Sequence, residues 1–189
     1  MAETVTIRPC RDGDLEAMRE ICIETSSLPL RNEKDREFLL LMYCDSYVEL
    51  EKENCFVAVS SGKVLGYILS SPDTKRFFRR FKKEIFPRIK KLGLSYSVNA
   101  GAVCFQQVVC SVLAPAHLHI DLTASARRKG TGTALINELK NHLSNRGINR
   151  VQLTCGSKNE AAVAFYKRNG FRTVIKAFGA CVMVTEITP

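Results

Sequence analysis

The chain has 189 residues, of which 46% are hydrophobic and 25% are charged, and its formal net charge is +9. This length and composition predict one packed domain over residues 1–189. The start, MAETVTIRPC, lacks the basic and apolar regions of a secretion signal, so we expect a cytoplasmic protein. The longest weakly polar stretch, 100–116, is too short for a bilayer span, so we expect no membrane contact.

The eight cysteines lie at scattered positions, and no C-x-x-C pair occurs. A disulfide framework or a zinc site usually shows a regular or paired spacing. We therefore expect most cysteines to be buried small hydrophobes. Cys104, Cys110, His117 and His119 could be imagined as ligands, but the missing spacing leads us to expect no metal.

The first 71 residues predict a strand, two helices and a hairpin. Residues 4–9 are predicted as a strand, and residues 12–25 as an amphipathic helix whose first-turn acids complement the helix dipole. A second helix is predicted over 33–53. Residues 54–71 hold two β-rich runs joined around Ser61-Gly62, which indicates a hairpin.

Most of the net charge lies in residues 75–91, which hold nine Lys or Arg and a single acid, Glu84. The apolar side chains of this segment recur at helical spacing, at Phe77, Phe78, Phe81 and Ile85. We therefore expect an amphipathic helix with a solvated basic face. The alternative is attraction of an anionic partner, such as a nucleic acid, a membrane surface, an acidic protein or a phosphorylated ligand.

The next segments predict a β-α-β unit. Residues 102–113 and 117–122 are predicted as strands, separated by Pro115, which disfavours a continuous ladder. The apolar positions then follow helical spacing over 131–146, and a strand is predicted over 150–155.

A second unit of this kind completes the chain. Residues 157–160 predict a capping box at the start of a helix, which Asn169-Gly170 ends. Residues 171–178 and 180–187 are predicted as two strands that close the sheet. These strands are rich in valine, and a homodimer is a possible arrangement, because an unpaired edge strand can pair with a second copy.

The stretch ARRKGTGTAL places Gly130 and Gly132 at the start of a helix. Glycine lets the backbone approach a ligand closely, and unpaired helix N–H groups favour an anion. No G-x-x-x-x-G-K-[ST] motif occurs, and Leu135 occupies the third small position of a dinucleotide fingerprint, so neither phosphate loop fits. A plain strand-to-helix connection would also use glycine.

The spacing Arg127-x-x-Gly130-x-Gly132, preceded by a strand, resembles the R/Q-x-x-G-x-G/A signature of the Gcn5-related N-acetyltransferase (GNAT) superfamily. The segments IRPCRDGDLEAM and NEAAVAFYKRNGF resemble the first strand and helix and the later coenzyme A motif of that family. GYILSSPDT and PAHLHIDL narrow the resemblance towards bacterial relatives of the C-terminal acetyltransferase-like domain of O-GlcNAcase. The resemblance covers nearly the whole chain.

The resemblance implies an α/β fold with a central mixed, mostly antiparallel sheet flanked by helices, and acetyl-coenzyme A as cosubstrate. The backbone of residues 128–133 would hold the pyrophosphate, and the strand around Ile120 would splay from its neighbour and pair with the pantetheine arm. The implied coenzyme-binding residues are Ile120, Leu122, Arg127, Arg128, Lys129, Gly130, Thr131, Gly132, Thr133, Asn159 and Tyr166. Asn159 has capping of the following helix as its alternative role.

The alternation in HLHIDL places Leu118, Ile120 and Leu122 on one face of a strand and the two histidines and Asp121 on the other. We expect the first face to be core and the second to be wet. A backbone N–H near Leu122 is the natural donor for the developing oxyanion, if the thioester carbonyl lies along this strand.

The resemblance assigns Tyr166 as the general acid that protonates the departing thiolate. An ordinary core tyrosine is the alternative. The amine must lose a proton before it attacks, and the candidate bases are Asp73 and Asp121, with His119 next. Asp73 has an alternative role as the cap of the basic helix.

The resemblance therefore implies an N-acetyltransferase that acts by direct attack of an amine, carried by a small molecule or a protein. The basic helical segment at about 73–91 is expected to be an insertion that shapes the acceptor side. One rival is a non-catalytic acyl-coenzyme A binding or regulatory module, and a second is a nucleic-acid binder that uses the basic segment.

Overall fold

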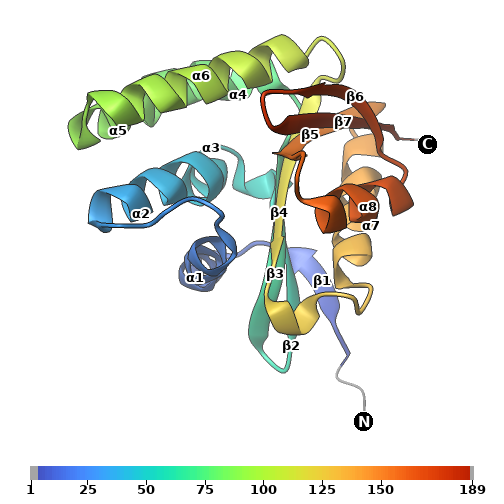
Figure 1. Cartoon of the computed structure of the whole chain (residues 1–189). Helices are drawn as coiled ribbons and strands as arrows, with labels where there is room; N and C mark the ends of the chain where they lie inside the picture. The colour runs from blue at the N-terminus through green and yellow to red at the C-terminus, as the bar shows by residue number, and fades with distance from the viewer. Residues whose placement is uncertain (1–3, 188–189) are drawn as a thin grey trace.

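The computed structural model describes residues 4–187 and contains a seven-stranded mixed sheet with helices on both faces (Figure 1). The strand order is β1-β2-β3-β4-β5-β7-β6. The strands are β1 (Thr6–Pro9), β2 (Phe56–Ser60), β3 (Lys63–Ser71), β4 (Ala116–Leu122), β5 (Arg150–Gly156), β6 (Arg172–Ala177) and β7 (Ala180–Glu186). The predicted fold class and mixed sheet are confirmed.

The α-helices of the described residues are α1 (Leu15–Thr25), α2 (Glu33–Leu40), α3 (Ser46–Glu51), α4 (Thr74–Glu84), α5 (Phe86–Leu92), α6 (Leu94–Cys110), α7 (Thr131–Ser144) and α8 (Glu160–Arg168). A π-helical turn, η2 (Leu41–Asp45), joins α2 to α3, and short 3-10 turns are η1 (Asp12–Asp14), η3 (Lys52–Asn54) and η4 (Ala124–Ala126). None of the helices in the described part of the chain is long and apolar enough to cross a bilayer.

Two hydrophobic cores hold the layers together, one on each face of the sheet. The first includes Tyr67 and Leu69 of β3 and packs against α1 to α6. The second includes Ile68 of β3 and packs against α7 and α8. Figure 1 shows the same division, with α7 and α8 on the opposite side of the strands from α1 and α2. Alternate residues of one strand therefore supply two different cores.

The predicted strand over 102–113 is wrong, because Leu94–Cys110 forms the single helix α6. A short apolar run rich in β-branched residues cannot be distinguished from a buried helix by composition. The helical period is visible in the buried side of α6, where Tyr96, Val103 and Cys104 pack against the first core. Tertiary packing against α4 and α5 therefore overrides the strand preference of the valines.

The basic segment forms two helices, α4 and α5, instead of one. Phe77, Phe81 and Ile85 are buried, as the helical spacing predicts. Ile85 separates the two helices, and a proline lies in the first turn of α5, where a missing N–H costs nothing. Most of the basic side chains are exposed, so the predicted solvated face is confirmed.

The helix cap predicted at residues 157–160 is also corrected. Asn159, and not Ser157, is the N-cap of α8, and its Oδ1 accepts a hydrogen bond from the Ala162 N–H over 3.0 Å. Ser157 instead lies in the turn after β5, where its N–H donates to the Gly179 carbonyl. The following strands β6 and β7 pair as predicted.

Candidate active site

The seam between β4 and β5 is the distinctive feature of the sheet. These two strands run parallel and pair only at Ala116–Val151 and His117–Gln152, whereas β4 pairs with β3 from His117 to Leu122. Beyond His117 the strands diverge, as the resemblance implied. One edge of the β4 backbone around Ile120 is therefore left without a strand partner, and such an edge accepts an added strand.

The turn between β4 and α7 lies at the open end of this gap. Gly130 is the N-cap of α7 with φ +82°, and Arg128 also has a positive φ of 61°. Arg127 to Gly130 are exposed, and the Arg127 Nε donates to the Leu122 carbonyl over 3.1 Å. The Thr131 hydroxyl is buried at this helix start and has no hydrogen-bond partner.

The two glycines of this turn serve different purposes. A Cβ at Gly130 would meet nothing within 4 Å, so the left-handed backbone conformation is what requires glycine there. A Cβ at Gly132 would lie 2.8 Å from the Phe165 ring and 3.0 Å from the Leu122 side chain. Gly132 thus allows α7 to approach α8 and β4 closely, which is a packing role and not an approach to ligand.

The polar face of β4 is covered by the helical layer, and the expectation of a wet face is wrong. His117 is 2% exposed, and its ring lies against the rings of Tyr47, Phe77 and Phe78. His119 and Asp121 are half-buried. The three side chains share one face, as the alternation predicts, but the sequence does not show that α1 to α4 close over both ends of this face.

A hydrogen-bonded network surrounds Asp121. Its Oδ2 accepts from the Tyr67 hydroxyl over 2.7 Å and lies 2.9 Å from the His119 Nε2. Burial acts to raise the pKa of Asp121, but His119, Tyr67 and Thr25 outweigh it and hold that pKa below its ordinary value. The carboxylate is therefore ionised at neutral pH, and its Oδ2 contacts both Tyr67 and His119.

His117 has a different environment from His119. Its Nδ1 lies 2.8 Å from the Thr74 hydroxyl, and its Nε2 is buried without a partner. Burial lowers the pKa of His117 to about 3, with a smaller effect from His119. His117 is therefore neutral in the folded protein, enclosed by aromatic rings.

Tyr166 approaches the seam from the other side of the sheet. It lies on α8, and its ring contacts Phe165 and Phe171. Burial raises the pKa of Tyr166 well above its ordinary value, and the nearby Cys155 and Asp121 add to this effect. The hydroxyl therefore keeps its proton at neutral pH, which a general acid requires. The raised pKa also widens its separation from that of a thiol.

Asp73 is not brought to this site. Its Oδ1 accepts from the Arg76 N–H over 2.9 Å and caps α4, which is the alternative role considered for it. In the sheet, Asp121 pairs with Tyr67, whereas Ser71 pairs with His117 at the other end of β4. Four strand residues, roughly 13 Å, therefore separate Tyr67 from Ser71, the last residue of β3, and Asp73 follows two residues later at the start of α4.

Sequence reasoning missed two tyrosines at the site. Tyr67 is fully buried on β3 directly opposite Asp121. Tyr43 lies in the π-helical turn η2, and its ring centroid is 5.4 Å from that of His119. Register across a hairpin could have suggested Tyr67, but no signal in the sequence marks a π-helical turn, a feature that is frequent at functional sites.

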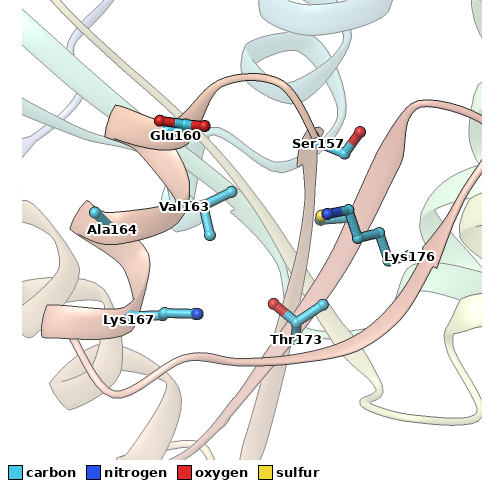
Figure 2. A pocket seen from close by; sticks show the side chains of 8 residues that line it. Ser157, Glu160, Val163, Ala164, Lys167, Thr173 and Lys176 are labelled. Atoms are coloured by element: carbon cyan, nitrogen blue, oxygen red, sulfur yellow. The ribbon is translucent and has the colours of Figure 1, made fainter.

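A separate recess of about 460 Å³ lies between α8 and the β6–β7 hairpin. Figure 2 shows Lys167 of α8 and Lys176 of β6 pointing into it from opposite sides. None of the predicted coenzyme-binding residues lines this recess. Among residues 4–187, no group of three or more His, Cys, Asp or Glu side chains is placed to hold a metal ion.

The family model described as the acetyltransferase (GNAT) family matches residues 15–171. The chain belongs to the GNAT family. A curated relative, the uncharacterised N-acetyltransferase MJ1207 of Methanocaldococcus jannaschii, is 43% identical over 54 residues. That match spans 28% of this chain and 24% of the relative.

Solved structures support the same fold for this GNAT protein. The structure of SsHAT has a TM-score of 0.89 and 27% identity, and the match covers 98% of this chain and 100% of that one. PaiA N-acetyltransferase of Thermoplasma acidophilum, solved with coenzyme A, has a TM-score of 0.62 and 15% identity over 97% and 99% of the chains. Polyamine N-acetyltransferase of Drosophila melanogaster has a TM-score of 0.65 and 18% identity, and the match covers 97% of this chain and 100% of that one.

Family membership indicates an acetyltransferase, and the solved neighbours support the fold. The observed residues fit acetyl-coenzyme A as cosubstrate. The helix start at Thr131 carries a buried hydroxyl without a partner, and the turn before it exposes Arg127, Arg128 and Lys129. An anion at a helix N-terminus is stabilised by free N–H groups and by basic neighbours.

Proposed function

We propose that this GNAT enzyme transfers an acetyl group directly to an amine at the seam between β4 and β5. The observation that carries the proposal is that the seam is flanked from both faces of the sheet. The His119–Asp121 pair lies on the face covered by α1, and Tyr166 lies on the face covered by α8. A proton acceptor and a proton donor are thus supplied from opposite sides.

In this proposal the turn before α7 and the open edge of β4 bind acetyl-coenzyme A. The N–H groups of residues 128–133 and the cationic side chains of Arg127 and Lys129 hold the pyrophosphate. The free edge around Ile120 and Leu122 pairs with the pantetheine arm by main-chain hydrogen bonds, and the Asn159 amide reaches the same arm while its oxygen caps α8. The bound cosubstrate supplies the reactive thioester.

His119 is the base in this proposal, and Asp121 is its positioning residue. The Asp121 carboxylate already accepts from Tyr67, and its lowered pKa makes it a weak base. By accepting the His119 Nε2–H it leaves Nδ1 unprotonated and able to take a proton from the amine. Asp121 therefore acts through His119, which revises the stronger expectation placed on the carboxylate itself.

Tyr166 donates to the departing sulfur. Because its raised pKa keeps the phenol protonated, the hydroxyl is available as a hydrogen-bond donor when the thiolate forms, and it then gives up its proton. A backbone N–H near Leu122 stabilises the oxyanion that develops during attack. These roles follow the family resemblance and the placement of Tyr166 at the seam.

Two classes of acceptor fit this proposal, a small amine and an amine of a protein. Solved relatives of this fold are named for both kinds, including a polyamine N-acetyltransferase and a ribosomal-protein-S18-alanine N-acetyltransferase of Escherichia coli. The helices α4 and α5 shape the acceptor side as an inserted basic segment. Their charge favours an acidic or phosphorylated acceptor and disfavours a basic tail of the kind suggested by the resemblance to O-GlcNAcase.

The test joins calorimetry to an amine screen. Acetyl-coenzyme A should bind the wild type with micromolar affinity and should not bind an Arg127→Ala, Gly130→Asp double variant, which removes a cation and adds an anion at the turn. Release of coenzyme A thiol would then be followed with diamines, amino acids and acidic peptides. Absence of cosubstrate binding by the folded wild type would refute the proposal, and binding without turnover on any amine would favour an acyl-coenzyme A binding module.

A further inference from the structure

The helix α6 is unusual in this chain because it carries no charge. No Asp, Glu, Lys or Arg occurs between Lys91 and His117, although 25% of all residues are charged. A surface helix of a soluble protein normally has a charged outer face. Figure 1 shows α6 along an outer edge of the molecule, with α4 and α5 beside it.

The outer face of α6 is an exposed apolar stripe that continues into the turn after it. Leu94 is 81% exposed, Val98 62%, Phe105 73%, Val109 49% and Val112 73%. These five make up most of the large exposed hydrophobics of the described residues. An apolar surface of this extent marks an interaction site rather than ordinary surface.

The spacing of the stripe is that of a helix-pairing seam. From Val98 the positions advance by four and three residues in alternation, through Ala102, Phe105 and Val109 to Val112. This alternation is the a/d pattern of two helices packed side by side. The opposite side of α6 is already used, since Tyr96 donates to Asp35 and Cys104 packs into the first core. The part of the stripe within α6, up to Val109, is therefore held outward by a fixed helix, and Val112 lies in the turn that follows.

We propose that α6 pairs antiparallel with α6 of a second copy of this chain, with the two-fold axis near Phe105. In this arrangement Phe105 meets its own symmetry mate, Val98 faces Val112, and Ala102 faces Val109. The small side chain of Ala102 leaves room beside the Phe105 ring. The surface is self-complementary, as an isologous interface requires.

Charge favours a second copy over the other occupants. Two chains of net charge +9 repel each other over most of their surfaces. Along α6 they can approach without bringing like charges together, because this helix carries none. A helix that lies on a membrane carries Lys or Arg along its own polar face, and α6 has neither. The stripe carries no Lys or Arg that could attract an acidic partner.

The area is sufficient for a reversible dimer. A helix of 17 residues is roughly 25 Å long. Phe105 offers on the order of 150 Å² and each exposed aliphatic side chain about 60–100 Å², so two stripes together bury roughly 1,000 Å². This is near the lower limit for a specific interface, so the dimer is expected to dissociate on dilution.

Sedimentation velocity of the full chain over about a hundredfold range of concentration tests the proposal. The wild type should pass from monomer to dimer, and Val98→Glu should raise the dimer dissociation constant by at least about tenfold. The double variant Val98→Glu, Val112→Lys should restore dimerisation, because the new charges face each other across an antiparallel pair. A parallel pair would instead oppose two glutamates.

Controls separate this surface from others. Val174→Glu, on the edge strand β6 where Val174 is 40% exposed, should leave the dimer intact. Each variant is expected to fold because the substituted side chains are exposed, and circular dichroism checks this. A wild type that stays monomeric throughout, or a dimer that Val174→Glu abolishes and Val98→Glu does not, would overturn the proposal. Binding to anionic lipid vesicles by a monomeric wild type, lost in Val98→Glu, would assign the stripe to a membrane surface.

Discussion

Tyr67 and Asp121 are direct cross-strand partners on β3 and β4, and the Tyr67 hydroxyl donates to the Asp121 Oδ2 over 2.7 Å. Opposed positions on antiparallel strands bring side chains of the same face together. The contact leaves the carboxylate in one orientation, in which it also reaches His119. A buried hydrogen bond on the core side thus helps to determine the position of the half-buried His119 ring.

Substitution of either His119 or Asp121 is predicted to slow the reaction. His119→Gln removes the proton acceptor and should lower kcat by about 10²–10⁴-fold. Asp121→Asn should cause a similar loss, because an amide stabilises the wrong imidazole tautomer, and it should also change the acid limb of the kcat/KM profile. An unchanged pH profile in Asp121→Asn would contradict a positioning role.

Tyr166→Phe tests the proton donor. We expect kcat to fall by about 10²–10⁴-fold with little change in the affinity for acetyl-coenzyme A, because the hydroxyl acts only when the thiolate leaves. Tyr96→Phe is the matched control, since it removes a tyrosine hydroxyl that binds Asp35 on α2. Steady-state kinetics and calorimetry of both variants measure the difference. A fall in binding with unchanged kcat would assign Tyr166 to cosubstrate binding alone.

Gly132→Ala is predicted to destabilise the fold. The new methyl group would lie 2.8 Å from the Phe165 ring and 3.0 Å from Leu122, so α8 or α7 must shift. Overpacking of this kind costs roughly 1–3 kcal/mol in the free energy of unfolding. Gly13→Ala is the control, because its Cβ would meet nothing within 4 Å. Urea denaturation of the two variants gives the comparison, and equal midpoints would show that the helices relax without cost.

The buried His117 predicts a pH dependence of stability. Its folded-state pKa is lowered to about 3, below the value near 6.5 expected in the unfolded chain. As the pH falls from about 6.5 towards 3, the unfolded chain binds a proton that the folded chain does not, so the free energy of unfolding falls. The slope approaches roughly 1.4 kcal/mol per pH unit. Burial also lowers the pKa of His142, so this residue contributes in the same direction.

Denaturation between pH 7 and pH 5, at about half-unit intervals, checks this slope above the range of ordinary carboxylates. His117→Gln should remove most of it, and His142→Gln, which alters a half-buried histidine bonded to Asn54, should remove less. An unchanged slope in His117→Gln would show that His117 is not its source and would contradict the prediction.

The elements around the site were predictable because their signals are local. The change from alternating to helical spacing after Leu122, and the left-handed Gly130, are encoded within a few residues. The wrong prediction of a strand over 102–113 has a different origin. Valine favours strands when its surroundings are unknown, and only contact with α4 and α5 shows that this segment is a helix.

The site itself was only partly predictable. The alternation of β4 correctly grouped His119 with Asp121, because strand geometry decides which side chains share a face. It could not show that helices cover that face, that Tyr67 completes the network, or that Asp73 caps α4 instead of joining the network. Those relationships depend on register and on helix placement, which involve contacts between distant parts of the chain.

The short pairing between β4 and β5 has a mechanical consequence. With two residue pairs joining them, β1 to β4 form one half of the sheet and β5 to β7 the other, and this seam contributes the least main-chain bonding to the assembly. In the proposed binding mode, the arm of the cosubstrate bridges this opening and takes the place of the missing strand. The amides of Leu118 to Leu122 that face the seam should then exchange with solvent more slowly once it is bound, so the substrate acts as a structural member of the sheet that it reacts beside.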